Sequence, residues 1–241
     1  MAQTLNLDSS GEAMGLYEVE PTGDARAAIV VVQEAFGVND HIMEVADRLA
    51  AEGWRAFAPA LFHRAGPDPV APYDDFSKVM PLFQGLDDDG VLRDLDATLD
   101  VVHQQGIDNP AIGMVGFCWG GRVTFLAAVR RSLGAAVGFY GGGIVSGRFP
   151  QFPPLVDEAG ALRTPWLGLF GDEDQSIPVE DVERLRDALT TSAKVDFDVI
   201  RYPRAGHGFH CDARPDSYVE GAASDGWTRA LAWFDAHLKT A

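Results

Sequence analysis

Short apolar runs alternate with amphipathic segments along most of this chain, and this alternation restricts the possible fold more than any other feature. The run at 27–33, AAIVVVQ, is rich in β-branched residues, which is typical of a strand buried on both faces of a parallel sheet. Asn39 and Asp40 are placed to begin a helix, and Gly53 is placed to end it. The same pattern predicts further strands at 55–59, 112–116, 135–140, 164–171 and 195–202, and further helices at 88–105, 179–189 and 223–238.

Strands that alternate with helices predict right-handed crossovers and a mostly parallel sheet with helices on both faces. The 241 residues are enough for one sizeable core and too few for two ordinary catalytic domains. We therefore expect one α/β domain over residues 1–241. Residues 60–87 and 141–163 carry Gly, Pro and Asp with weak periodicity, and we expect them to form loops over the site.

Composition restricts the partners of the chain. The formal net charge is −17, so the summed field opposes binding of nucleic acid or of an anionic membrane. Without an apolar run that could span a bilayer, and without the basic and apolar regions of a signal peptide at its start, the chain is expected to be a soluble cytoplasmic protein. With only two cysteines, a disulfide framework does not supply its stability.

One of these cysteines lies in a pattern that carries chemistry. The segment at 115–121 reads VGFCWGG, which matches the GxSxG nucleophile elbow with Cys118 in place of serine. Such a turn strains the backbone of the nucleophile, and the helix that follows directs its N-terminus at the sulfur and stabilises a thiolate. A buried structural cysteine is the alternative interpretation. The place of Cys118 between a strand and a helix, together with a histidine and an acid that follow later in the chain in the order expected of a hydrolase, favours catalysis.

A histidine to serve as the base is expected after a later strand. Residues 202–209 read YPRAGHGF, and the glycine-flanked His207 lies in the loop before the last helix, where the order nucleophile, acid, histidine places the base. His210 is its nearest rival among the other histidines.

The acid that orients this histidine is expected after the strand at 164–171, where the chain reads GDEDQSIP. A carboxylate there would fix the imidazole tautomer and stabilise the imidazolium. We choose Asp174 because the hydrolase pattern GxxDxxxP fits Gly171, Asp174 and Pro178. Asp172 is the alternative.

Three segments, QEAFGVN at 33–39, GFCWGG at 116–121 and AGHGF at 205–209, resemble the signature segments of the dienelactone hydrolase family. They occur in order, and the resemblance covers nearly the whole chain. It implies a compact α/β hydrolase without a separate lid domain, acting on a small ester or lactone and needing no metal or organic cofactor. We expect a monomer or a small homo-oligomer.

The resemblance also implies a role for Glu34. In that family the equivalent glutamate holds the resting thiol, and substrate binding rearranges it so that the thiolate pairs with the histidine. A nearby carboxylate opposes a second negative charge on sulfur, so Glu34 would protect Cys118 from oxidation. The expected oxyanion hole consists of the backbone amides of Ala35 and Trp119.

The arginines that bind the lactone carboxylate in well-known members of the family do not carry over. Cys211 stands where the arginine after the catalytic histidine is expected. Candidate replacements are Arg214, Arg122, Arg148 and Lys78. A broader carboxylesterase or thioesterase, and a non-catalytic binding module on the same scaffold, remain the alternative functions.

Overall fold

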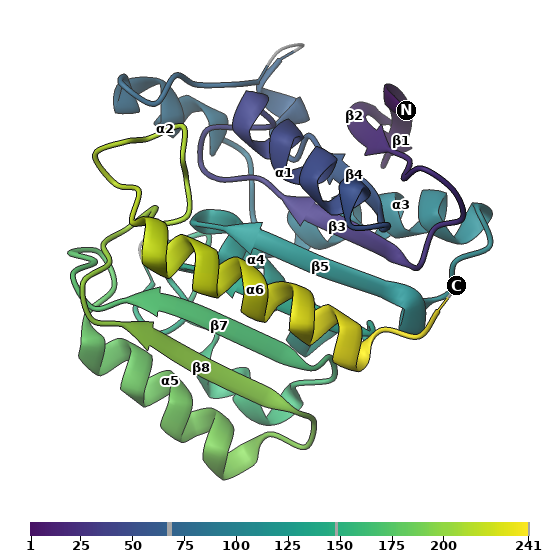
Figure 1. Ribbon diagram of the computed structural model, residues 1–241. Helices are drawn as coiled ribbons and strands as arrows, with labels where there is room; N and C mark the ends of the chain where they lie inside the picture. The colour runs from purple at the N-terminus through teal and green to yellow at the C-terminus, as the bar shows by residue number, and fades with distance from the viewer. Residues whose placement is uncertain (67–68, 148, 241) are drawn as a thin grey trace.

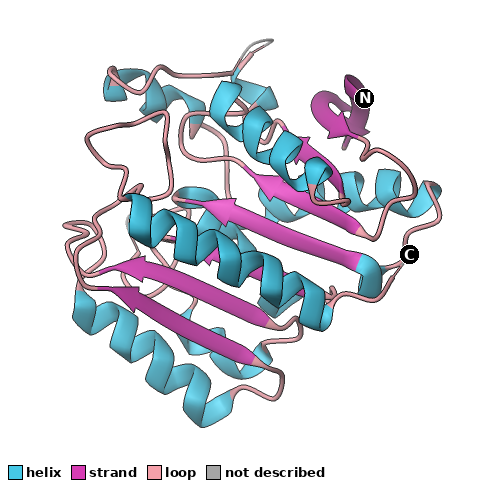
Figure 2. Ribbon diagram, in the orientation of Figure 1, coloured by secondary structure: helices cyan, strands magenta, loops and turns pink. Residues whose placement is uncertain are grey.

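The computed structural model of the chain describes residues 1–66, 69–147 and 149–240. Within these ranges the strands form one sheet in the order β1-β2-β4-β3-β5-β6-β7-β8. The six strands β3, β4, β5, β6, β7 and β8 run parallel to one another. Strands β1 and β2 are antiparallel to their neighbours (Figure 2). The strands are β1 (Ala2–Ser9), β2 (Glu12–Val19), β3 (Ala28–Val32), β4 (Arg55–Pro59), β5 (Ile112–Phe117), β6 (Ala135–Phe139), β7 (Trp166–Gly171) and β8 (Phe197–Tyr202).

Helices cover both faces of this sheet. In Figure 1, α1 and α6 lie in front of it, whereas α3 and α4 lie behind. The mostly parallel, two-sided arrangement predicted from the alternating pattern is confirmed. The helices are α1 (Asp40–Ala51), α2 (Val79–Leu82), α3 (Asp88–Gln104), α4 (Trp119–Arg130), α5 (Val179–Ser192) and α6 (Glu220–His237), with short 3-10 helices at His63–Ala65, Phe76–Lys78, Asn109–Ala111 and Val156–Ala161.

The predicted start of α1 is also confirmed. The Asn39 side chain accepts a hydrogen bond from the Ile42 amide at 3.2 Å and so satisfies a free donor of the first turn. Gly53 follows the helix with a φ of 95°, a conformation that glycine adopts without strain. The helix therefore begins and ends where its sequence signals lie.

The N-terminal hairpin of β1 and β2 was not predicted. Seven of the eight residues of β1 are at least partly exposed, so this strand lacks the apolar run that marks strands such as β3 and β5. Ser9 pairs with Glu12, and Ser10 and Gly11, with φ of 57° and 87°, make the two-residue turn. Positive φ at both positions is typical of a tight hairpin turn, and the Ser-Gly pair was the available signal.

The inner face of α6 consists mainly of small residues. Phe234 is buried, but Trp227, Leu231 and Leu238 are only partly buried. Small residues line the buried face, and a side-chain carbon on Gly226 would lie 3.0 Å from the Phe139 ring. The helix therefore packs close to the sheet, and its large side chains lie at the edges of that contact.

The loops expected over the site lie where the parallel strands end. In Figure 1 the arrowheads of β5, β7 and β8 point to the side of the molecule that carries α2 and the loop before α6.

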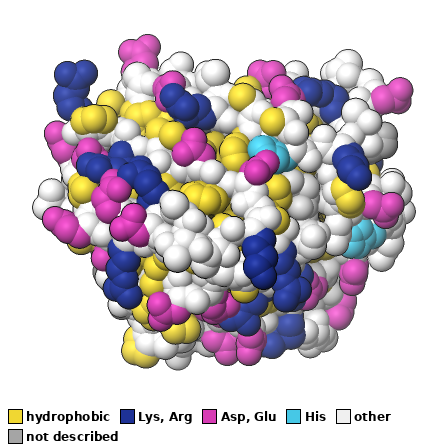
Figure 3. Space-filling model, turned by 90° about the horizontal axis from the view of Figure 1, so that it is seen from below, with side chains coloured by type: hydrophobic (Ala, Val, Ile, Leu, Met, Phe, Trp, Pro, Cys, Tyr) yellow, Lys and Arg dark blue, Asp and Glu magenta, His cyan; other side chains and the backbone are white. Residues whose placement is uncertain are grey.

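On the face seen in Figure 3, basic side chains lie among acidic ones. Among the described residues, the helices are all too short or too polar to cross a membrane.

Close packing of α4 on β5 forms the turn at Cys118. A side-chain carbon on Gly116 would lie 2.2 Å from the Gly120 carbonyl oxygen, and one on Gly120 would lie 2.5 Å from the carbonyl oxygens of Val32 and Gln33. Since these neighbours are backbone atoms, they cannot move aside without disturbing the sheet. Both glycines of the GxCxG segment are therefore needed for the helix to approach the strands.

This packing predicts that Gly116→Ala lowers the free energy of unfolding by at least about 2 kcal/mol, because the new methyl group overlaps the backbone of α4. Gly221→Ala is the matched control. No atom lies within 4 Å of the added carbon at Gly221, and replacing a helical glycine by alanine should raise stability by up to about 1 kcal/mol. Urea unfolding measures both changes, and equal effects would contradict the packing argument.

Candidate active site

Cys118 occupies a strained turn between β5 and α4. Its φ is 56° and its ψ is −120°, which is unfavourable for a residue with a Cβ. The backbone holds this geometry, because the Cys118 amide donates to the Phe139 oxygen at 3.0 Å and the Cys118 oxygen accepts from the Gly121 amide at 3.0 Å. The strained conformation predicted for the elbow is confirmed, and the partly exposed residue lines a cavity.

The two residues predicted as partners of Cys118 meet it at this turn. His207 Nε2 lies 3.0 Å from the Cys118 sulfur. Its other ring nitrogen, Nδ1, lies 2.6 Å from Asp174 Oδ2. Asp174 follows β7 and His207 follows β8, so the parallel sheet brings the three side chains to one edge.

Charge and burial act in opposite directions on this histidine. Burial would lower the pKa of His207, but the Cys118 sulfur and the hydrogen bond to Asp174 together raise it to about 10. Burial likewise opposes ionisation of Asp174, yet His207 and Ser176 hold the pKa of its carboxyl below the usual value. The protonated imidazolium is therefore the favoured form of His207 near neutral pH.

Ser176 is a member of this arrangement that the sequence interpretation missed. Its hydroxyl and its amide both donate to Asp174 Oδ1, at 2.6 and 2.8 Å, and its hydroxyl oxygen lies 3.3 Å from His207 Nδ1. The acidic side chain thus accepts at both oxygens and is fixed in orientation. An aspartate followed two residues later by serine is a common local turn, and this was the available signal.

The two rival residues lie elsewhere. Asp172 accepts from the Arg201 guanidinium at 2.7 and 2.9 Å, which occupies both of its oxygens. His210 is buried against Phe117 and Phe139, where burial, with a contribution from nearby positive charge, lowers its pKa to about 3. The geometry therefore favours Asp174 over Asp172 and His207 over His210.

Glu34 is fully buried, but its partners differ from the predicted one. It accepts hydrogen bonds from the hydroxyls of Tyr73 and Tyr140, at 2.9 and 3.4 Å. Burial, together with the negative charge of Glu34, raises the pKa of both tyrosines, so they remain donors. Among the described residues, the sulfur of Cys118 has His207 as its hydrogen-bond partner. The structure thus has the arrangement in which the Cys118 sulfur pairs with His207 rather than with Glu34.

A cavity of about 550 Å³ lies over the Cys118 turn. Ala35 and Trp119, whose amides were predicted to form the oxyanion hole, both line it. Trp119 is the first residue of α4, so its N–H has no partner within the helix. The loops at 60–87 and 141–163 supply much of the remaining surface, as expected, through Tyr73, Phe76, Val79, Phe83, Gly142, Gly143, Phe149 and Phe152.

Two of the candidate anion-binding residues reach this cavity. The Arg122 guanidinium is buried and makes a bidentate ion pair with Asp88, at 2.6 and 2.9 Å, which neutralises it. Arg214 packs over the rings of Phe36 and Tyr73, at 5.7 and 5.4 Å.

Of the other two candidate cations, the structure describes Lys78. Lys78 is mostly exposed and lies 3.6 Å from Asp75. Arg148 lies outside the described residues. Among the described candidates, Arg214 is therefore the cation best placed to meet a substrate anion.

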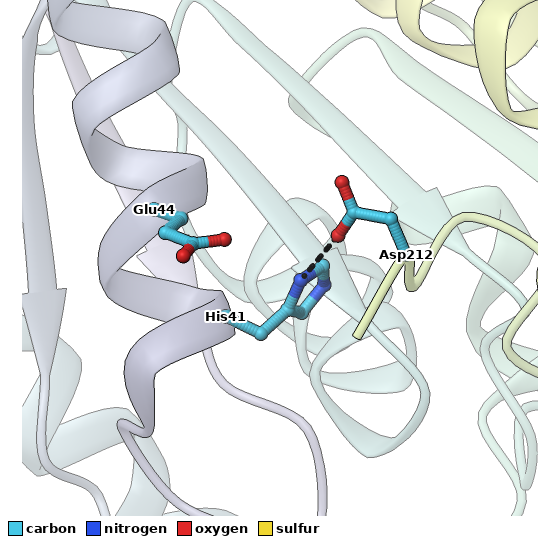
Figure 4. A group of neighbouring side chains, drawn as sticks. All are labelled: His41, Glu44 and Asp212. Atoms are coloured by element: carbon cyan, nitrogen blue, oxygen red, sulfur yellow. Dashed lines mark ion pairs between the residues drawn. The ribbon is translucent and has the colours of Figure 1, made fainter. Parts of the chain in front are cut away.

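A second group of side chains has the composition of a metal site. His41 and Glu44 on α1 and Asp212 in the last loop approach one another, with His41 Nδ1 3.2 Å from Asp212 (Figure 4). The Arg48 guanidinium, however, lies 2.6 Å from Asp212 and 3.7 Å from Glu44. Since the two carboxylates already share this cation, the group is better described as an ion-pair network.

Comparison with known proteins relates the chain to one family. The model described as "Dienelactone hydrolase family" matches residues 14–238. A Salmonella typhimurium protein named "Putative carboxymethylenebutenolidase" is 42% identical over 95% of this chain and 85% of its own length. A Bradyrhizobium protein named "Probable 2-oxo-3-(5-oxofuran-2-ylidene)propanoate lactonase" is 29% identical over 97% and 94%.

The fold agrees with this assignment. The crystal structure titled "Putative Dienelactone Hydrolase", from Klebsiella pneumoniae, superposes with a TM-score of 0.90 at 39% identity, covering 98% of this chain and 99% of that one. The predicted α/β-hydrolase fold is therefore confirmed.

The charge balance at His207 predicts a measurable change when the sulfur is removed. In Cys118→Ser the hydroxyl carries no negative charge near neutral pH, so the pKa of His207 should fall well below about 10. NMR titration of the imidazole measures it. Cys211→Ser is the control, because Cys211 makes a hydrogen bond to the Tyr73 hydroxyl rather than to His207. A pKa of His207 that stays near 10 in Cys118→Ser would contradict the pairing of this histidine with the Cys118 sulfur.

Proposed function

The chain belongs to the dienelactone hydrolase family, and we propose that it hydrolyses a small ester or lactone with Cys118 as the nucleophile. It is a carboxylic ester hydrolase of the carboxymethylenebutenolidase type. The observation that supports the cysteine mechanism most directly is the 3.0 Å contact between the Cys118 sulfur and His207 Nε2 at a strained strand-to-helix turn. In the proposal, His207 moves the protons and Asp174 orients it.

The first half of the reaction forms a thioester. The Cys118 thiolate attacks the carbonyl carbon, and the carbonyl π electrons move to oxygen to give a tetrahedral oxyanion. When this intermediate collapses, the bond to the alcohol oxygen breaks and the leaving alkoxide takes the proton from His207 Nε2. For a lactone the alcohol remains attached to the acyl group, so the ring opens.

The oxyanion needs donors at the position where its charge develops. We assign this role to the backbone amides of Ala35 and Trp119, two residues that line the cavity together with Cys118. The positive end of α4 points to the same place, which adds a favourable field.

The second half releases the acid. Neutral His207 takes a proton from water while the water oxygen attacks the thioester carbon. The new tetrahedral intermediate expels the Cys118 thiolate, and the acid leaves with the water oxygen. Asp174, held by Ser176, stabilises the imidazolium in both halves.

Glu34 acts in this proposal by its position. Its charge is satisfied by the hydroxyls of Tyr73 and Tyr140, which leaves the sulfur paired with His207. Rotation of Glu34 toward the sulfur would favour the protonated thiol, because two anions would otherwise lie together. The carboxylate would then suppress reaction of the thiol when no substrate is present.

The nucleophile assignment predicts that Cys118→Ala lowers kcat/KM for phenyl acetate by about a thousandfold or more, because the thioester cannot form. Release of phenol measures the rate, and circular dichroism checks that the fold is retained. Cys211→Ala, at the other cysteine, should keep most of the activity. Turnover that is undiminished in Cys118→Ala would overturn the mechanism, whereas binding of the acid by a wild-type protein that never releases phenol would indicate a non-catalytic module.

The position of Arg214 separates a lactonase for anionic substrates from a broader esterase. If its guanidinium binds a substrate carboxylate, Arg214→Gln should lower kcat/KM for a carboxylate-bearing lactone by about 10- to 100-fold, since a charged hydrogen bond is lost. Its methyl ester should be hydrolysed nearly as before. Lys78→Gln is the control for a general loss of positive charge, and an equal effect of Arg214→Gln on both substrates would favour the broader esterase.

A further inference from the structure

Four aromatic side chains form one wall of the cavity over Cys118. Phe83, Trp119, Phe149 and Phe152 all line it, and we call this set the aromatic wall. We infer that the enzyme recognises esters whose acyl or alcohol part carries an aromatic ring, which packs on this wall. The inference rests on the proposed function and specifies its substrate class.

The rings of the wall contact one another in the geometries that aromatic groups prefer. Phe83 meets Trp119 edge to face at 5.3 Å and stacks on Phe149 at 5.6 Å, while Phe152 lies 5.9 Å from both Phe83 and Trp119. Edge-to-face and offset stacked pairs gain energy beyond the area that they bury. A further aromatic ring added to this cluster gains the same energy, whereas an aliphatic group of similar size gains only the burial.

The wall is held in place before any substrate binds. Arg122 donates to the Pro153 carbonyl oxygen at 2.7 Å and lies over the Phe152 ring at 5.4 Å. The Phe152 amide donates to the Phe149 oxygen at 2.9 Å, which ties the two rings of this loop together. A preformed surface loses little conformational entropy on binding, so its contacts contribute more of their energy to affinity.

The charge near the wall favours a neutral group there. Among the residues that the structure describes, Arg122 is the basic side chain against these rings, and its bidentate pair with Asp88 neutralises it. Arg214, in contrast, lies over Phe36 and Tyr73, which are not part of the wall. The cavity therefore offers an apolar aromatic surface separate from its candidate anion-binding residue.

The wall is close enough to the nucleophile to affect the reaction. Trp119 directly follows Cys118, so the wall begins at the residue whose amide we assign to the oxyanion hole. A ring one methylene away from the scissile ester can then contact the wall while the carbonyl is attacked. Such contact lowers the barrier to thioester formation when it is retained in the transition state.

The test compares two pairs of neutral esters that differ in the ring alone. The acyl pair is methyl phenylacetate and methyl cyclohexylacetate, and the alcohol pair is benzyl acetate and cyclohexylmethyl acetate. Acid release gives kcat/KM for each. Wild-type enzyme should favour the aromatic member of at least one pair by about fivefold, the gain expected for an aromatic contact beyond burial.

Variants at the partly exposed Phe149 test whether the wall is the source of this preference. Phe149→Leu should bring the ratio of kcat/KM for the aromatic ester to kcat/KM for its cyclohexyl analogue close to one. Phe149→Tyr, which retains the ring, should preserve this ratio. Phe197→Leu on β8, outside the cavity lining, controls for the loss of a phenylalanine elsewhere and should leave the ratio unchanged.

The outcomes separate this inference from the proposed function. A wild-type enzyme that hydrolyses both members of each pair equally, or a Phe149→Leu variant that keeps the full preference, would overturn the role of the wall and leave the cysteine mechanism intact. Turnover of these esters by Cys118→Ala, or no turnover by wild type, would instead contradict the proposed function.

Discussion

The contact between α4 and β5 is the constraint on which the site depends. Gly116 and Gly120 let the helix approach until backbone meets backbone, and the chain can make that turn only if Cys118 adopts a positive φ. The strain at this residue is offset by the burial of all six residues of β5 and most of α4. The sulfur is therefore held over the edge of the sheet, at the N-terminus of a helix.

The polar side chains around the sulfur form two groups with different roles. His207, Asp174 and Ser176 form a chain of hydrogen bonds that ends at the sulfur. Glu34, Tyr73, Tyr140 and Cys211 form a second group, in which two tyrosines satisfy a fully buried carboxylate. In the second group the carboxylate is therefore stabilised by neutral hydroxyl donors rather than by a cation.

The sequence predicted the elements whose signal is local. Strands such as β3 and β5 are continuous apolar runs, and the elbow, the histidine loop and the acid loop each follow a strand. The rest depends on contacts between distant segments. The sequence left Asp172 as an alternative to Asp174. The fold favours Asp174 because Arg201, from a distant segment, donates to both oxygens of Asp172. The tyrosines on Glu34 come from residues 73 and 140, and no spacing within the chain relates them to residue 34.

The Arg122 side chain has a consequence for how this enzyme can diversify. It joins Asp88 at the start of α3 to the loop that carries Phe149 and Phe152, whereas the turn at Cys118 is held by β5, β6 and α4. The phenylalanines that line the cavity therefore lie on loops, whereas the turn that performs the chemistry lies between β5 and α4, the helix that also carries Arg122. Changes in the loops at 60–87 and 141–163 could alter substrate range over evolution, or in a directed library, while the geometry of the nucleophile is inherited unchanged.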